Sequence, residues 1–547
     1  MASTIQTNRP RKNKFDLSRE VKMTGNMGYL YPAFIQDVIP GDSYQVNTQQ
    51  LIRFSPLLAP MMHNIDFKLD YFFVPYRLVW SEWKDFITGA DEYDWKTNTE
   101  YDPPSYPKVK INKWTADNYL TKGSLLDYMG VPPIYTSCLG ENYHQKTLAG
   151  ALTGNLTEAE NQFDISVLPA RAYQLIYHEY FRDQNVGTEF EQHTSSGYIQ
   201  GAGDKSEQLT LRKSNWEKDY FTSALPFLQR GPEVELPIEG TLPVDFEFNN
   251  TSYLRNPNPN INFSGNLTSQ AEPNNYTSVN NTGVAIDSSA NYSVDLGDST
   301  SVTINELRKA TALQRWLELM ARAGSRYREQ IQAIFGERVP DYTVQVPQYL
   351  GGGKTSIMIS EILSTYTDSA ATGDRPQGDM TGHAMGLGEN IGFKQSFTEH
   401  GIILGLARII PKSSYVQGLS KFWQKFDKFD HYFPQFANLG EQEVHNKELF
   451  LKGHPTDDDV FGYQQRYAEY KYSFNRVAGD FRDTLNYWEL SRRFNQHPNL
   501  NQNFVECNPD PRIFAVTEVN EDKIWMNLHH RVNALRPIPY HSNPSLT

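Results

Sequence analysis

Apolar and polar residues alternate with a period of two at many places along the chain, which is the pattern of half-buried strands. From 65 to 71, Ile65, Phe67, Leu69 and Tyr71 are separated by charged residues. Segments 244–248 and 342–346 repeat the pattern, and shorter stretches that predict strands are 44–48, 357–359, 393–397, 402–409 and 524–528. Because these strands are short and far apart in sequence, they predict an antiparallel sandwich whose elaborations lie in the connections.

Helical periodicity is found mainly inside those long connections. The segment Pro169–Asp183 places apolar side chains on one face and has a proline suited to a first helical turn. A second helix is predicted over 305–335, with an interruption at Gly324. Both patterns are typical of helices that pack against a core.

The length and composition describe a large globular chain. It has 547 residues, of which 39% are hydrophobic, 13% aromatic and 21% charged. One core rarely grows to serve so long a chain, so either several domains or one domain with large insertions is expected. The longest apolar stretch, Gly401–Ile410, is short and contains Arg408, so no membrane insertion is predicted. The basic N-terminal residues are followed by no apolar segment, and we therefore expect no secretory signal and synthesis in a cytosol.

The net charge of −13 argues against a protein that coats nucleic acid over its whole surface. The N-terminal end is an exception, because residues 1–22 hold six bases against two acids. We interpret 1–27 as a basic, flexible arm that can contact phosphate. A solvated terminus without a partner is an equally good interpretation.

One segment is set apart by its polar composition. Of the 57 residues from Asn249 to Asn305, 28 are Asn, Ser or Thr. A stretch like this buries little and is expected at a surface. Its Asn-X-Ser/Thr triplets arise from the composition itself, and we do not expect them to carry glycans.

Two motifs resemble parts of catalytic sites but lack an essential residue. Gly351–Ser356 reads GGGKTS, yet Gln348 stands where a phosphate-binding loop needs its first glycine. His178 and Glu179 match half of a zinc protease helix, but Arg182 occupies the place of the second histidine. Neither nucleotide hydrolysis nor zinc proteolysis is predicted.

Other polar clusters favour structural roles. Asp457–Asp459 is a carboxylate run better explained by solvated loop acids or a helix N-terminus than by calcium. His529 and His530 face opposite sides of a predicted strand. Cys138 and Cys507 are expected to be reduced, structural thiols. No cofactor, metal or catalytic set is predicted, although paired carboxylates are common enough that spacing alone does not exclude a glycosidase.

Basic groups alternate with aromatic rings in two stretches, Lys421–Phe429 and Arg466–Phe494. Unpaired bases can stack on such rings while cations contact the phosphates. Ordinary packing in a tyrosine-rich protein is favoured at any single residue.

Several stretches, in order along most of the chain, resemble the major capsid protein of microviruses, and within them the gokushovirus branch. The residues that carry the resemblance are Gly28–Asp42, Tyr71–Trp80, Tyr180–Asn185, Phe221–Pro226, Tyr349–Gly353, Ser396–Gly401, Leu439–Gln442 and Phe461–Tyr470. No motif of this family is found in the Asn/Ser/Thr-rich segment.

This resemblance implies a mainly β fold, a single eight-stranded antiparallel jelly roll over 28–547 with long inter-strand insertions containing helices. It also implies about 60 copies in a T=1 icosahedral shell, built in the cytoplasm of a host bacterium and forming the virion. Expected partners are other copies of the chain, a circular single-stranded DNA, a small basic DNA-binding viral peptide and a host cell-surface receptor. The unmatched segment 232–304 is the expected threefold protrusion.

We therefore predict a structural shell protein that is not an enzyme. The predicted DNA contacts are Arg9, Arg11, Lys12 and Lys14. The predicted host-attachment residues are Asn262, Asn266, Asn275, Tyr276, Asn280, Asn291 and Tyr292. The alternative is a carbohydrate-binding or carbohydrate-cleaving β-sandwich protein, which would stay small in solution.

Overall fold

The structure is a computed structural model that describes residues 11–88, 93–94, 99–100, 104–112, 118–132, 162–199, 202–232, 234, 241–243, 293–295, 304–365, 378–473, 475–518 and 521–541. The chain divides into two compact units, one formed by Met1–Leu228 with Ala323–Thr547 and the other by Gln229–Arg322. The fold is mainly β with antiparallel sheets. Among the helices in these ranges, none has the length and apolar character needed to span a membrane.

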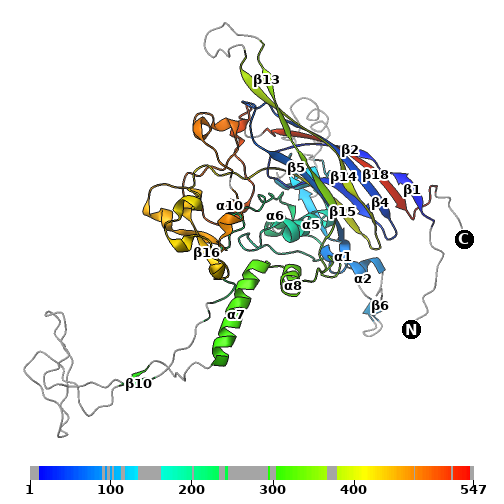
Figure 1. Cartoon of the computed structure of the whole chain (residues 1–547). Coiled ribbons are helices and arrows are strands. Elements are labelled where there is room, and N and C mark those ends of the chain that lie inside the picture. The colour runs from blue at the N-terminus through cyan, green and yellow to red at the C-terminus, as the bar shows by residue number, and fades with distance from the viewer. Residues whose placement is uncertain are drawn as a thin grey trace, which may run out of the picture. The chain divides into compact units, whose positions relative to one another are not determined.

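Two sheets form the centre of the larger unit (Figure 1). The six-stranded sheet has the order β1–β18–β4–β14–β13, and β2 pairs with a second part of β18. Its strands are β1 (Asn13–Asp16), β2 (Arg19–Gly25), β4 (Ser43–Phe54), β13 (Met358–Leu363), β14 (Met380–Ser396) and β18 (Ile524–Arg536). The four-stranded sheet has the order β12–β5–β15–β3, from β12 (Gln348–Ser356), β5 (Ile65–Pro75), β15 (Gly401–Pro411) and β3 (Tyr31–Val38).

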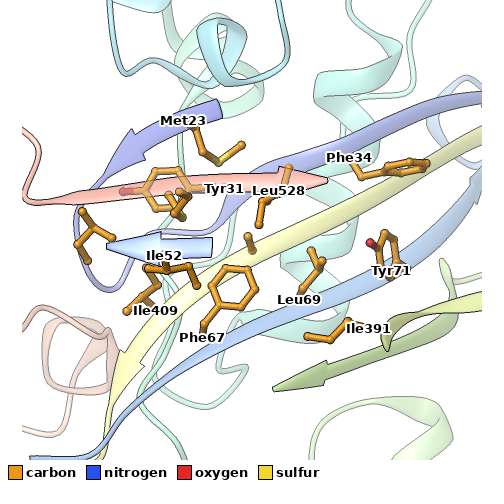
Figure 2. Packing of buried hydrophobic residues seen from close by; sticks show 14 of the residues in the cluster. Met23, Tyr31, Phe34, Ile52, Phe67, Leu69, Tyr71, Ile391, Ile409 and Leu528 are labelled. Atoms are coloured by element: carbon orange, nitrogen blue, oxygen red, sulfur yellow. The ribbon is translucent and has the colours of Figure 1, made fainter. Parts of the chain in front are cut away.

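The main core lies between these two sheets. Figure 2 shows Ile52 and Leu528 of the six-stranded sheet with Phe67, Leu69 and Ile409 of the four-stranded sheet in one cluster. All five side chains are almost fully buried. Alternate residues of each strand supply this core, as the period of two predicts.

The four-stranded sheet is also covered on its second face. Phe72 and Leu404 pack there against Tyr173 and Ile176 of α5 (Leu168–Ile176). A sheet buried on both faces needs continuous apolar strands, which explains the apolar run of β15, broken only by Arg408. The six-stranded sheet keeps the strict alternation of buried and accessible residues in β4 and β18. Its second face, called the outer face below, is therefore open to a partner.

The remaining elements lie in the connections. Between β5 and β12 they are α1 (Tyr76–Val79), α2 (Trp83–Thr88), β6 (Tyr93–Asp94), β7 (Thr99–Glu100), β8 (Lys108–Asn112), η1 (Asn118–Leu120), α3 (Leu125–Tyr128), β9 (Gln162–Ser166), η4 (Tyr177–Phe181), α6 (Ala202–Leu209), β10 (Thr241–Pro243), β11 (Ser293–Asp295), α7 (Ile304–Ala323) and α8 (Tyr327–Phe335). Between β15 and β18 they are η5 (Lys421–Gln424), η6 (Lys428–Asp430), η7 (Pro434–Phe436), β16 (Glu441–His445), α9 (Asn446–Leu449), η8 (Pro455–Asp458), β17 (Val460–Gln465), η9 (Ala468–Tyr470), η10 (Gly479–Arg482), η11 (Asn486–Trp488), α10 (Gln502–Val505) and η12 (Pro511–Ile513).

Most of the strands and both helices expected from the pattern are confirmed, with two differences. The segment 342–346 is not a strand, because the chain turns at 341–345 and Gln345 has a left-handed φ of 59°. The helix expected over 169–183 ends as α5 at Ile176 and continues as a π turn to Phe181. Gly324, with φ of 95°, separates α7 from α8 as predicted. The segment 244–248 lies outside the described residues.

The N-terminal region differs from the flexible arm expected over 1–27. Asn13–Asp16 and Arg19–Gly25 are strands that pair in series along one edge of β18. The 13 residues of β18 leave a long row of backbone groups on that edge, and β1 and β2 satisfy them. Met23 adds a buried side chain to the core. The basic end is thus attached to the sheet from residue 13 onward.

Candidate functional site

The outer face of the six-stranded sheet is polar and accessible. On β18, Trp525, Arg531 and Asn533 are exposed, Asn527 and His529 are half-buried, and the alternate residues are buried. Their partners on β4 are Arg53, Asn47 and Gln45, in that order. These residues share the face because directly paired residues of antiparallel strands point to the same side.

Of the four predicted DNA contacts, Lys14 lies at the edge of this face, and two others directly precede its strand in sequence. Lys14 is exposed on β1 and pairs with Leu535 of β18, so it extends the outer face at its edge. Arg11 and Lys12 directly precede this strand and are exposed. Arg9 lies outside the described residues. The structure therefore brings Lys14 onto the sheet and holds its two basic neighbours close by in sequence.

The cations of the outer face are freer than its acids. Among the described residues, Arg53, Arg531 and Lys394 make no ion pair or side-chain hydrogen bond, and all three are exposed. The exposed acids of this face have partners within the chain: Glu389 accepts a 3.0 Å hydrogen bond from Gln49, and Glu20 lies 3.3 Å from Lys22. The carboxylate of Asp16 accepts hydrogen bonds from the Ser18 hydroxyl and N–H, which lower its pKa. Free positive charge is therefore available to an anionic partner.

The motifs that resembled catalytic sites have structural roles. Gly351–Ser356 forms part of β12 and pairs with β5, so it is extended and wraps no phosphate. His178 Nδ1 lies 2.9 Å from the Glu179 carboxylate, and its Nε2 lies 3.1 Å from the Arg182 guanidinium. A guanidinium occupies the position in which a zinc site would need a ligand.

Asp457 explains the carboxylate run at 457–459. It is buried at the start of η8 and accepts hydrogen bonds from the N–H groups of Lys452 at 3.2 Å, Gly453 at 2.7 Å and His454 at 3.1 Å. His497 contacts the same carboxylate at 2.8 Å. The helix N-terminus interpretation is the correct one. In the part of the chain that the structure describes, no three His, Cys, Asp or Glu residues gather as a metal site.

His529 and His530 lie on opposite faces of β18, as predicted. His530 is fully buried, with Nδ1 2.8 Å from Thr48 Oγ1 and Nε2 3.1 Å from the Ala33 carbonyl. Burial lowers the pKa of His530 to about 4, so the ring is neutral at pH 7. Cys507 is buried and reduced, and burial raises the pKa of its thiol. Cys138 lies outside the described residues.

Aromatic rings of the stretch Lys421–Phe429, and of the residues that follow it, are exposed. Its rings reach exposed fractions of 68% for Phe422, 67% for Trp423 and 90% for Phe426. We call Phe422, Trp423, Phe426, Phe429, Tyr432 and Phe433 the aromatic surface; all six are exposed.

Two of the three cations of this stretch, Lys421 and Lys425, are engaged by the protein, whereas Lys428 is exposed and its Nζ lies 4.9 Å from the centre of the Phe429 ring. Lys421 Nζ donates to the Glu443 carbonyl at 2.9 Å, and Lys425 lies 3.7 Å from the centre of the Tyr470 ring. The aromatic surface is therefore mainly apolar, with Lys428 as an exposed cation at Phe429, and its apolar area favours contact with protein over contact with phosphate. In the second stretch, Arg492 packs 4.1 Å from the centre of the Phe504 ring, so the packing interpretation holds there.

The profile of the capsid protein (F protein) family matches residues 3–546. The chain belongs to this family of capsid proteins. It is 34% identical to the capsid protein VP1 of Chlamydia phage 1 over 100% of this chain and 97% of that protein. It is 32% identical to VP1 of Bdellovibrio phage phiMH2K, over 98% of this chain and 95% of the relative. It is 26% identical to VP1 of Spiroplasma virus 4, over 100% of this chain and 97% of the relative.

The prediction of a microvirus major capsid protein is confirmed, and the carbohydrate-binding alternative is not favoured. A capsid protein has a structural role in the virion and assembles with copies of itself into a shell. The exposed aromatic surface and the open outer face are then two surfaces that an isolated chain leaves uncovered.

The predicted host-attachment residues lie outside the described residues. They are Asn262, Asn266, Asn275, Tyr276, Asn280, Asn291 and Tyr292. The described part of the smaller unit consists of residues 229–232 and 234, the β10–β11 pair and most of α7. The Leu317 carbonyl of α7 accepts a 3.4 Å hydrogen bond from Arg230 N–H.

Sequence reasoning missed Trp525, Arg53 and Lys22 as outer-face residues. The available signal was the strand predicted over 524–528, in which the large ring of Trp525 occupies a position between two buried ones. The pairing with Arg53 depends on a strand more than 400 residues away and has no local signal.

Proposed function

We propose that this capsid protein forms a T=1 icosahedral shell of about 60 copies around a circular single-stranded DNA genome, with each copy built on one eight-stranded jelly roll. The observation that carries the proposal is the order of strands in the two sheets. Full-length relatedness to phage capsid proteins supports it independently.

The strand order supports a jelly roll as follows. Numbered along the chain as the first to the eighth, the relevant strands are β2, β3, β4, β5, β12, β14, β15 and β18. One sheet then has the order first, eighth, third, sixth, and the other has the order second, seventh, fourth, fifth. This is the arrangement of a sheet pair wound from two Greek keys. Strands β1 and β13 are additions at the two edges of the six-stranded sheet.

The two large insertions lie between the fourth and fifth strands and between the seventh and eighth strands of this numbering. The connection from β5 to β12 spans 76–347, and the connection from β15 to β18 spans 412–523. One sandwich core with two large insertions accounts for 547 residues without a second sandwich. The first connection contains the smaller unit, Gln229–Arg322.

Part of that smaller unit is the proposed host-attachment protrusion, residues 232–304. Its support is the Asn/Ser/Thr-rich composition, which suits an exposed surface, and the fact that it belongs to a compact unit of its own. The basic end around Arg11, Lys12 and Lys14 is the proposed contact to the genome. A small basic viral peptide would offset further charge, because each copy carries −13.

Expression of the full chain, followed by electron microscopy and sedimentation, tests the proposal. Closed isometric particles that protect single-stranded DNA from nuclease are the expected result. A chain that remains monomeric under all assembly conditions, or that binds glycans as a small species, would overturn it.

A further inference from the structure

A groove of about 660 Å³ opens on the outer face at the end of β18 that carries Trp525. This volume falls within the range of about 300–1,000 Å³ that small-molecule sites have. Trp525 pairs with Arg53 on one side and with Thr24 on the other, and its indole is 48% exposed. Lys22 and Leu51 also line the groove.

We propose that this groove binds one unpaired nucleotide of the packaged single-stranded DNA. The base stacks on the Trp525 indole, and the adjacent phosphates contact Arg53 and Lys22. The inference rests on the proposed enclosure of a single-stranded genome. It means that the outer face, which is the face of the six-stranded sheet that points away from the main core, lines the interior of the shell.

The exposed ring of Trp525 and the cations Arg53 and Lys22 support nucleotide binding. Every base has a π-face, so an exposed indole binds unpaired bases without regard to sequence. Arg53 makes no ion pair or side-chain hydrogen bond within the described part of the chain, and Lys22 has only an exposed contact at 3.3 Å with Glu20. Both are therefore available to phosphates beside a stacked base.

The acids that line the groove do not oppose this. Asp127 accepts a 2.8 Å hydrogen bond from the N–H of Gly123. Asp522 accepts hydrogen bonds from Thr24 Oγ1 at 2.5 Å and Asn26 Nδ2 at 3.1 Å. These neutral donors leave the charge of both carboxylates in place, but Lys22, Arg53 and Lys122 give the lining of the groove three cations against two acids.

The row of cations along β18 on the outer face also supports the proposal. Ten residues of β18 separate Trp525 from Leu535, which is about 33 Å at the rise of a strand. Arg531 lies along this line, and Lys14 lies beside its far end. A row of cations that starts at an exposed ring matches the charge of a nucleic-acid backbone, whereas a second copy of this acidic chain would have to supply carboxylates to all of them.

Binding of short single-stranded DNA to the purified full chain tests the proposal. The probes are labelled oligo(dT) and an abasic oligonucleotide of the same length. Trp525→Ala should weaken oligo(dT) binding roughly 10-fold and leave binding of the abasic strand unchanged, because only stacking is lost. Arg53→Gln should lower the salt slope of log K by about 0.7, the value for one phosphate on a single strand. Leu535→Ala, an exposed residue at the far end of β18, is the matched control and should bind as the unmodified chain does.

Crosslinking keeps the proposal testable if a variant fails to fold. Unmodified particles that carry 5-iododeoxyuridine in their DNA should crosslink on irradiation, and the crosslinked peptide should contain Trp525. The proposal is overturned if folded Trp525→Ala binds oligo(dT) normally, or if that variant loses assembly but not DNA binding. It is also overturned if the crosslinks are confined to peptides that lack Trp525. Particles that form without any DNA would instead refute the proposed genome enclosure, a result separate from oligonucleotide binding.

Discussion

His530 is buried in the main core as a neutral ring. Its Nδ1 faces the Thr48 hydroxyl, so the hydroxyl donates there and Nε2–H donates to the Ala33 carbonyl. A charged imidazolium would have to be desolvated in this place, and burial for that reason lowers the pKa to about 4, against about 6.5 in the unfolded chain.

This pKa predicts how stability depends on pH. Between pH 6.5 and 4 the unfolded chain binds a proton that the folded chain does not, so stability is full above pH 6.5 and falls as the pH is lowered toward 4. At pH 5 the expected loss is about 2 kcal/mol. Urea unfolding of the full chain at pH 7 and pH 5 measures it. His530→Gln should lack this loss, whereas His529→Gln, altered on the outer face, should retain it; equal losses in both variants would contradict the assignment.

At the scale of single elements, β1 and the residues before it form the basic edge of the six-stranded sheet. Because β1 is held by β18, the charges of Lys12 and Lys14 have a fixed place beside the outer face. A charge that is held in place contributes more reliably to phosphate binding than one on a free end.

Charge reversal at this edge predicts a packaging defect. Arg11→Glu, Lys12→Glu and Lys14→Glu together should reduce the fraction of DNA-filled particles on the order of tenfold, and lower the salt slope for single-stranded DNA by about 2. Lys452→Glu, which changes one exposed cation in the β15–β18 connection, is the control and should leave packaging unchanged. Normal DNA content in the triple variant would exclude these residues as genome contacts.

The proposed protrusion is the second element with a direct test. Deletion of Asn256–Asp298 should leave shell assembly largely intact and abolish attachment to the host, because a polar surface segment contributes little to the core. Particle yield by sedimentation and adsorption to host cells give the two measurements. A deletion that destroys folding, or particles that adsorb normally, would show the protrusion to be wrongly placed.

At the scale of the whole molecule, the apolar surface of the isolated chain must be buried by its neighbours in the shell. The aromatic surface is the strongest example, with Phe426 90% exposed. A fully buried aromatic side chain contributes about 1.5–3 kcal/mol, and a closed shell repeats each contact in every copy.

Removal of these rings therefore predicts an assembly defect without a folding defect. Phe422→Ser with Phe426→Ser should raise the protein concentration needed for assembly at least tenfold, as measured by light scattering, and leave the urea midpoint of the chain unchanged. Leu387→Ser is a matched control, because Leu387 is 70% exposed but lies on the outer face. If the double variant assembles as the unmodified chain does, the aromatic surface is not a contact between copies of the chain and must bind a different partner.

The sequence by itself determined where most strands and helices lie, but not which helices pack in a core: α5 is buried, whereas α7 has one buried residue, Ala321, and α8 has none. Ile65–Tyr71 alternates because one side of β5 faces the main core, and this pattern is local enough to be seen without a structure. The family motifs identified the protein for a similar reason, since they are contiguous in the chain. The turn at 341–345 was mistaken for a strand because alternation over a few residues also arises where the backbone reverses.

Only the tertiary structure decided which side chains share a surface. Lys421 and Lys425 turn inward while the neighbouring rings face solvent, a choice made by Glu443 and Tyr470, which lie elsewhere in the sequence. Trp525 stands beside Arg53 because β18 pairs with β4 across most of the chain. The physical reason is that strand pairing and burial are set by contacts between distant segments, whereas the alternation of residues records only that one face of each strand is buried.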